Sequence, residues 1–132
     1  MTVERITPQE AESRLAADAG YVYVDVRTAQ EFAQGHVPGA INIPLLVEGA
    51  GGSGLRPNPK FLEEAQEELA PSDHLIVGCL RGGRSLRAAG ILERAGFRHV
   101  SDMRGGYDGE VDSSGRVIFP GWARLGLPTT SV

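Results

Sequence analysis

The stretch HLIVGCLRGGRS, residues 74–85, decides how the rest of the sequence is interpreted. Its first five residues, 74–78, form a short apolar run bounded by turn residues, which predicts a buried strand. After a turn with two adjacent glycines, a helical pattern runs from about Arg84 to Ala95, and Gly96 is placed to end that helix. A buried strand that turns tightly into a helix is typical of a parallel βαβ unit.

The same alternation of strands and helices recurs along the chain. Thr7-Pro8-Gln9-Glu10 predicts the start of a helix over roughly 8–18, and Thr28 with Glu31 predicts a second, short helix that Gly35 ends. The further elements that we expect are strands over 21–26, 40–43 and 99–101, a glycine-rich loop over 48–58, and a helix from 58–59 to about Leu69. Together they predict one α/β domain over residues 1–132, with a small, mainly parallel sheet and helices on both faces.

Composition excludes several classes of protein. The chain has 132 residues, and 13 basic against 17 acidic side chains give a net charge of −4, which argues against a nucleic-acid partner. We expect no membrane partner and a cytoplasmic location, because no apolar run approaches about 20 residues and the start lacks a signal-peptide pattern. One cysteine and three scattered histidines form neither an internal disulfide nor a zinc pattern, so no metal or other cofactor is expected.

The single cysteine, Cys79, directly follows the strand over 74–78 and should therefore lie at the carboxyl edge of the sheet, where ligands bind in such folds. Gly82 and Gly83 allow a tight loop whose N–H groups point toward its centre, and Arg81 and Arg84 add positive charge. The following helix presents the positive end of its dipole to the same point. Such surroundings favour the thiolate, so we interpret Cys79 as a nucleophile.

Two other interpretations of this loop are open. A single cysteine is commonly a small buried hydrophobic residue, although that role requires neither the arginines nor the glycines around Cys79. The loop is alternatively a phosphate cradle without chemistry, but it lacks the Gly-Lys-Ser/Thr ending of a nucleotide-binding loop.

The motif Cys79-x-x-Gly82-x-Arg84-Ser85 resembles the active-site loop of rhodanese-type sulfurtransferases. The resemblance extends from about residue 5 to 130. Asp25-Val26-Arg27 with Glu31-Phe32, and then 35–44 (GHVPGAINIP), are similar to the amino-terminal signature, and Gly105-Gly106 and Gly126-Leu127-Pro128 resemble the carboxyl end. Fifteen residues separate Gly106 from Trp122, more than is common in the family, which predicts an insertion at about 107–121 with a hairpin over 111–119.

The resemblance implies a sulfurtransferase in which Cys79 is the catalytic residue and carries a persulfide. The substrate is expected to contact the rest of the loop, namely Leu80, Arg81, Gly82, Gly83, Arg84 and Ser85. We expect Asp25 and Arg27 to support the loop, with Asp25 accepting hydrogen bonds from loop N–H groups or from an arginine, and Arg27 to pair with Glu31 four residues on. His36 is placed in a scaffold turn, so a structural role is favoured over one as a base.

The expected partners are a small anionic sulfur donor, such as thiosulfate or a persulfide, and a thiol or protein acceptor. One alternative is a non-catalytic persulfide carrier or interaction module. Another is a cysteine phosphatase or arsenate reductase, which a related fold also carries. Those phosphatases use a Cys-x5-Arg loop, whereas Cys79 and Arg84 form Cys-x4-Arg, a smaller ring that suits one sulfur atom better than a phosphoryl group. The sequence does not set the oligomeric state.

Overall fold

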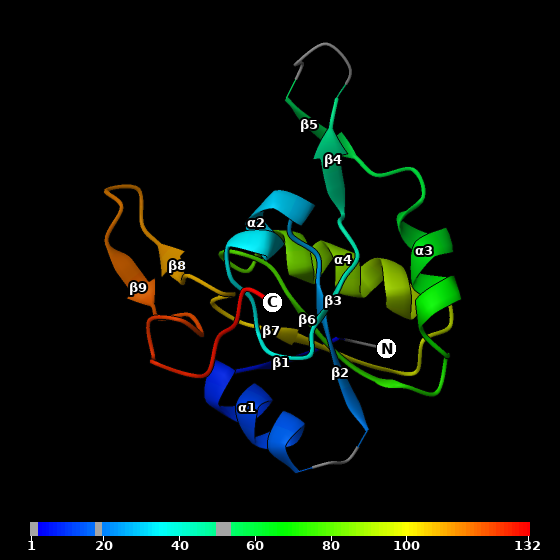
Figure 1. The fold of residues 1–132 in the computed structure, drawn as a ribbon, viewed down its shortest axis with the longest axis horizontal. Coiled ribbons are helices and arrows are strands. Elements are labelled where there is room, and N and C mark those ends of the chain that lie inside the picture. Colours follow the sequence, from blue (N-terminus) through cyan, green and yellow to red (C-terminus); the bar gives the residue numbers. More distant parts are fainter. Residues whose placement is uncertain (1–2, 18–19, 50–53) are drawn as a thin grey trace.

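A five-stranded sheet forms the centre of the computed structural model, which describes residues 3–17, 20–49 and 54–132 (Figure 1). The strand order is β1-β7-β6-β2-β3, and every neighbouring pair is parallel. The strands are β1 (Glu4–Ile6), β2 (Tyr21–Asp25), β3 (Ile41–Asn42), β6 (His74–Gly78) and β7 (His99–Met103). The predicted fold class, an α/β domain built on a mainly parallel sheet, is confirmed.

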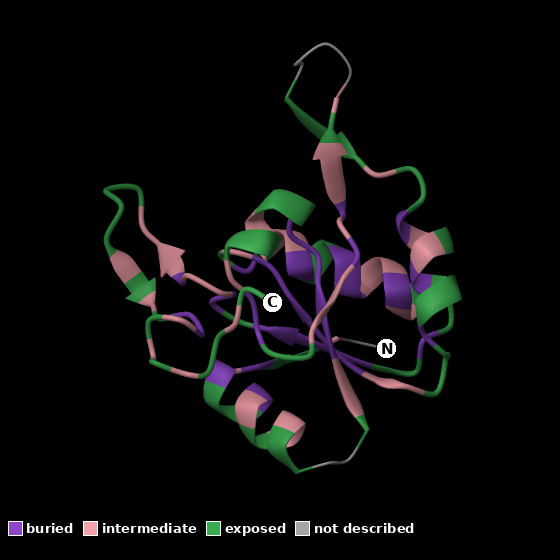
Figure 2. Ribbon diagram, viewed as in Figure 1, coloured by how far each residue is buried: buried purple, intermediate pink, exposed green. Residues whose placement is uncertain are grey.

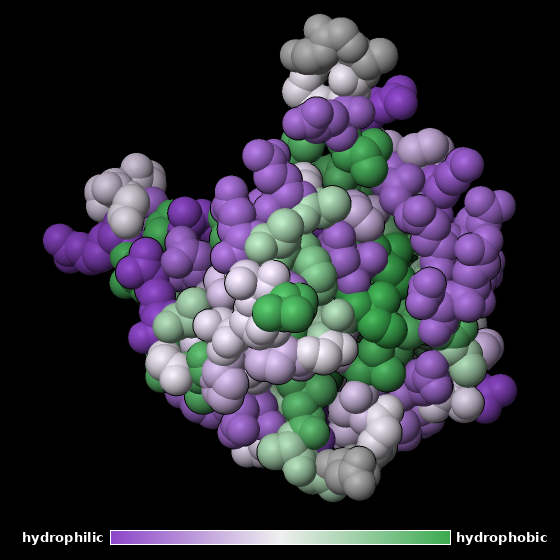
Figure 3. Space-filling model, viewed as in Figure 1, coloured by the Kyte–Doolittle hydropathy of each residue, from purple (hydrophilic) through white to green (hydrophobic). Residues whose placement is uncertain are grey.

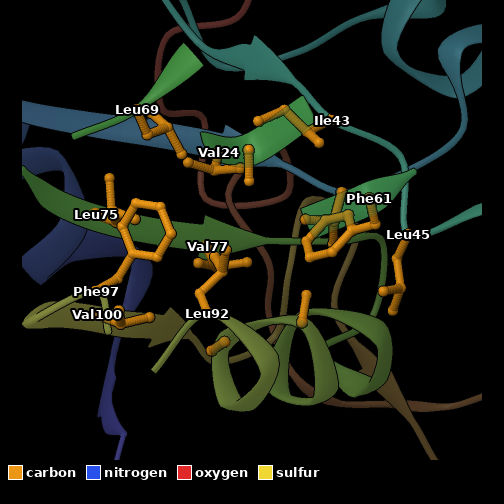
Figure 4. Close-up of a cluster of buried hydrophobic side chains, with 14 of the residues drawn as sticks. Val24, Ile43, Leu45, Phe61, Leu69, Leu75, Val77, Leu92, Phe97 and Val100 are labelled. Carbon is orange, nitrogen blue, oxygen red and sulfur yellow. The ribbon is translucent and has the colours of Figure 1, made fainter. Parts of the chain in front are cut away.

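Helices cover both faces of this sheet (Figure 1). One buried cluster joins β2 and β6 to α3 (Phe61–Glu68) and α4 (Gly83–Arg94) (Figures 2 and 4). A second cluster, on the opposite face, joins the sheet to α1 (Pro8–Ala16) and to Trp122. In β6, Leu75 and Val77 belong to the first cluster and Ile76 to the second, as expected for a strand whose successive side chains alternate between two covered faces.

Local sequence signals set the beginnings of two helices. Thr7 and Thr28 cap α1 and α2 (Ala29–Gln34), and in each case a glutamate three residues later completes a capping box, as predicted. The helix α3 begins at Phe61, later than predicted, because the Asn58 side chain accepts a hydrogen bond from the Lys60 N–H and holds the preceding residues in a turn.

Two small hairpins extend from the sheet (Figure 1). The first pairs β4 (Leu46–Glu48) with β5 (Leu55–Pro57), so the prediction of a loop throughout 48–58 is wrong at its ends; residues 50–53 lie outside the described part. The glycine and proline in this segment predict a loop. Antiparallel pairing between β4 and β5 overrides that local prediction. Apolar side chains gather at its base (Figure 3). The second hairpin, β8 (Glu110–Val111) with β9 (Val117–Phe119), confirms the hairpin predicted over 111–119.

The sequence analysis missed one strand and predicted another too short. The strand β1 was not predicted, since three residues are too few to show an alternating pattern. The strand β7 extends beyond Ser101 to Met103 and therefore includes Asp102. Parallel pairing places Arg5 of β1 opposite Asp102, a contact between residues far apart in the sequence.

Candidate active site

Cys79 lies immediately after β6, at the carboxyl edge of the sheet, and only 1% of its surface is exposed. Its Sγ accepts a hydrogen bond from the Gly82 N–H at 3.0 Å and lies 3.4 Å from the Ser85 Oγ. Gly82 has φ +106, a left-handed conformation that glycine adopts without strain, and it is the residue that turns the chain into α4. The thiol therefore faces a backbone donor and the positive end of a helix dipole, an arrangement that stabilises a negative charge on sulfur.

The segment after β7 supports the cysteine loop from behind. The Tyr107 N–H donates to the Cys79 carbonyl at 2.7 Å, and the Asp108 N–H donates to the Leu80 carbonyl at 2.9 Å. Gly106 has φ +62, and a Cβ on it would lie 2.5 Å from the Cys79 carbonyl oxygen. The paired glycines of the carboxyl-end motif thus allow two backbones to approach closely.

Arg84 is joined to α2 by an ion pair. Its two terminal nitrogens donate to the Glu31 carboxylate at 2.9 and 3.2 Å. Burial opposes the ionisation of Glu31, but hydrogen bonds from Arg84 and from the Thr28 N–H outweigh it and lower the pKa of Glu31 to about 2. The hydrogen bond that Arg84 donates to Glu31 also raises the pKa of Arg84. The predicted pair between Arg27 and Glu31 is wrong, because Glu31 contacts the cysteine loop instead.

Arg27 pairs with Asp25. This pair is buried, with each residue 2% exposed, and the Arg27 Nη2 lies 2.8 Å from the Asp25 carboxylate. The arginine partner predicted for Asp25 is thus present, but its carboxylate accepts only from Arg27 among the described residues. Arg27 also donates to the Gly35 carbonyl, and its guanidinium lies over the Tyr107 ring at 4.4 Å. Through Tyr107, whose N–H binds the Cys79 carbonyl, the pair contacts the segment that supports the cysteine loop.

Arg81 projects to the side of the loop that faces the second hairpin. It donates to the Gly109 carbonyl at 3.2 Å and lies 3.6 Å from the Asp108 carboxylate, and 46% of its side chain is exposed. Beside it, a cavity of about 340 Å³ is lined by residues of α2, the cysteine loop and the segment after β7, including Arg27, Leu80 and Tyr107. Leu80 of the cysteine loop thus lines an opening in the surface.

Asp102 is the site residue that the sequence analysis missed. It is fully buried, and its Oδ1 accepts a short hydrogen bond from the Ser85 hydroxyl while its Oδ2 accepts from the Arg5 Nε at 2.9 Å. Burial raises the pKa of Asp102, and the bonds from Ser85 and Arg5 oppose this effect. The predicted strand over 99–101 ended one residue before Asp102, so the sequence did not place this acidic residue in the sheet.

His36 lies away from the cysteine. Its backbone forms a bridge with Thr130, its Nδ1 lies 2.7 Å from the Phe32 carbonyl oxygen, and its ring stacks on that of Phe32. These contacts agree with a structural role in joining α2 to the carboxyl end. Trp122, 2% exposed, packs in the second cluster and donates to the Pro128 carbonyl. Among the described residues, no three His, Cys, Asp or Glu side chains are grouped so as to hold a metal ion.

The model of the rhodanese-like domain family matches residues 7–111, most of the chain. The chain belongs to this family. As a rhodanese-like domain it is 43% identical over 132 residues to thiosulfate sulfurtransferase 16, chloroplastic, of Arabidopsis thaliana, and the match covers 98% of each chain. It is also 36% identical to thiosulfate sulfurtransferase 18 of the same plant, over 84% of this chain and 82% of the relative.

A solved structure shares the fold of this chain. The crystal structure of Rv0390 from M. tuberculosis superposes with a TM-score of 0.79 at 25% identity, and the match covers all of both chains. Some relatives are longer: the rhodanese-like domain spans about half, 54%, of the protein HIGH ARSENIC CONTENT 1, mitochondrial, of A. thaliana, which it matches at 43% identity. The names of these relatives include chloroplastic and mitochondrial, so they do not support the predicted cytoplasmic location. In the described part of the chain, no helix has the length and apolar character of a membrane span.

Proposed function

We propose that this rhodanese-like domain is a sulfurtransferase that carries a sulfane sulfur on Cys79. The observation that carries the proposal is the position of the Cys79 Sγ, 3.0 Å from the Gly82 N–H at the start of α4. A thiolate in that position is both stabilised and nucleophilic. Two relatives named thiosulfate sulfurtransferase, matched over most of their length, support the same class of reaction.

The reaction has two half-reactions. The Cys79 thiolate attacks the outer sulfur of thiosulfate; a new S–S bond forms, the S–S bond of the donor breaks, and sulfite leaves with its electron pair. A thiolate or cyanide then attacks the outer sulfur of the Cys79 persulfide, and the Cys79 thiolate leaves. The separate intermediate implies ping-pong kinetics. The loop N–H groups, among them that of Gly82, would stabilise the terminal negative charge of the persulfide.

The arginines of the loop have different proposed roles. Arg81 is half exposed, and it is the arginine that we assign to attracting the anionic donor. Arg84 is held by Glu31, and we assign it to the electrostatics and shape of the loop. Asp25 and Arg27 support the loop at a distance, since their buried pair packs on Tyr107, whose N–H binds the Cys79 carbonyl.

Mass spectrometry of the intact protein tests the proposal. After exposure to thiosulfate the protein should gain the mass of one sulfur atom, and cyanide should remove it with formation of thiocyanate. The Cys79→Ser variant is the control and should gain no mass while keeping its circular dichroism spectrum. The proposal would be refuted if the protein gained no sulfur from any donor tested. It would also be refuted if the Cys79→Ser variant gained as much sulfur as the unmodified protein.

Steady-state turnover separates the alternatives. A persulfide carrier would load sulfur once and release it only slowly to small acceptors, whereas a sulfurtransferase turns over many times. A cysteine phosphatase or arsenate reductase would process its oxyanion faster than thiosulfate. The Cys-x4-Arg spacing of Cys79 and Arg84 favours the sulfur atom over a tetrahedral oxyanion.

A further inference from the structure

A chain of hydrogen bonds, buried at Cys79, Ser85 and Asp102, leads from the cysteine to Arg5 of β1. The Cys79 Sγ lies 3.4 Å from the Ser85 Oγ, the Ser85 hydroxyl binds Asp102 Oδ1, and Asp102 Oδ2 binds the Arg5 Nε. Ser85 and Asp102 are both 0% exposed and Cys79 is 1% exposed. Three groups that can donate or accept hydrogen-bonding protons are therefore in contact and shielded from water.

The single proton of the Ser85 hydroxyl makes this chain directional. When Asp102 is ionised, its carboxylate can only accept, so the hydroxyl donates to Asp102 and turns its lone pairs toward the Cys79 sulfur. A hydroxyl in this orientation accepts from the S–H and thereby favours the neutral thiol. When Asp102 is protonated, its O–H donates to Ser85, and the hydroxyl proton can then be donated to a Cys79 thiolate, which competes for it with the Gly82 carbonyl oxygen 3.3 Å away.

We propose that Asp102 acts on Cys79 through the Ser85 hydroxyl, so that the carboxyl group and the thiol titrate as one coupled pair. Asp102 is thus a positioning residue that determines when the thiolate forms. Its effect opposes that of the Gly82 N–H and the dipole of α4, which favour the thiolate. The inference concerns the cysteine on which the proposed function rests, but it makes claims about ionisation that hold whatever reaction Cys79 performs.

Other charged and titratable groups also act on the pair. Those that bear on Asp102 are Arg5 from β1, Glu110 from β8 and Tyr23 from β2, and those that bear on Cys79 are Arg84 from α4 and Tyr23. In the described part of the chain, none of these groups forms hydrogen bonds with both Asp102 and Cys79, whereas the Ser85 hydroxyl contacts both. The hydroxyl is therefore the group whose removal should uncouple them.

Alkylation of Cys79 by iodoacetamide, followed across the pH range in which thiols ionise, tests the coupling without requiring sulfur transfer. Asp102→Asn removes the buried charge and supplies an N–H donor to Ser85, so the hydroxyl can donate to the thiolate. The midpoint of the alkylation profile should move to lower pH by about one unit or more, which raises the rate about tenfold on the acid side. The control is Asp108→Asn, which removes a partly exposed carboxylate next to the loop and should move the midpoint by less than about 0.3 unit.

A double-mutant cycle shows whether the effect passes through the hydroxyl. In the Ser85→Ala background, Asp102→Asn should shift the midpoint by less than half as much as in the unmodified chain. An equal shift in both backgrounds would overturn the proposal, because the effect would then act through space. No shift, or a shift to higher pH, would overturn it as well.

A measurement without an Asp102 variant keeps the proposal testable if that variant does not fold. The carboxyl carbon of Asp102, followed by NMR, should show a second titration step at the pH where Cys79 ionises. Blocking Cys79 with methyl methanethiosulfonate should remove this step, and Ser85→Ala should weaken it. The coupling is refuted if the chemical shift of the Asp102 carboxyl carbon does not change at the pH where Cys79 ionises. A failure to transfer sulfur, with these shifts present, would refute the proposed function alone.

Discussion

The ion pair between Glu31 and Arg84 fixes the cysteine loop to α2, and its contribution to stability can be predicted. The change is Glu31→Gln, which removes the charge but keeps a side chain able to complete the capping box with Thr28. The pKa of Glu31 falls from 4.5 to about 2 in the folded protein, and each unit corresponds to about 1.36 kcal/mol. The shift gives an upper limit of about 3.4 kcal/mol, and because 27% of the Glu31 side chain is exposed we expect about half of that, roughly 1.5–2 kcal/mol.

The pH dependence follows from the direction of the shift. Because the folded-state pKa is lowered, the stabilisation is fully present above the unfolded value of 4.5 and is lost as pH falls toward about 2. Urea unfolding of both proteins should therefore show a difference of about 1.5–2 kcal/mol at neutral pH that falls to less than half near about pH 3.

The first capping box provides the matched control. Glu10 completes the same motif with Thr7 at the start of α1, and no arginine pairs with it among the described residues. Glu10→Gln should cost less than about 0.5 kcal/mol and show little dependence on pH. If both variants lose equal stability, or if the loss from Glu31→Gln is the same at neutral and acid pH, the ion pair does not stabilise the folded protein.

Three further predictions concern the loop. Gly106→Ala should destabilise the protein by about 3 kcal/mol in urea unfolding, since the added Cβ would collide with the Cys79 carbonyl. Gly126 also has a positive φ, but nothing lies within 4 Å of an added Cβ, so Gly126→Ala should cost only about 1 kcal/mol. Equal losses in the two variants would contradict the role of close approach at Gly106. Arg81→Ala should mainly raise KM for thiosulfate, while Arg84→Ala should also lower kcat and move the acidic limb of the pH–rate profile upward; the reverse pattern would exchange their roles. Insertion of one glycine between Gly83 and Arg84 should weaken sulfur transfer in steady-state assays, and an unchanged kcat/KM would show that ring size does not select for sulfur.

The sequence by itself determined the elements whose signals are local. Capping boxes at Thr7 and Thr28 set the starts of two helices, because the bonded groups lie three residues apart. The apolar run 74–78 followed by Cys79 set the position of the cysteine at the carboxyl edge of the sheet, since a buried parallel strand must lead into its crossover helix there. The hairpin near 111–119 was predicted from strand-forming residues on either side of a turn.

Tertiary structure alone decided which charged groups meet at the site. Spacing along a helix allowed Arg27 and Glu31 to pair, but Arg27 turns to Asp25 and Glu31 binds Arg84, which is 53 residues away. The strand β1 exists because β7 offers it a parallel edge, and its register brings Arg5 to Asp102, 97 residues on. Contacts of this kind depend on strand order, register and the free energy of burying each charge. The residues that neighbour a charged side chain in the sequence encode none of these three quantities.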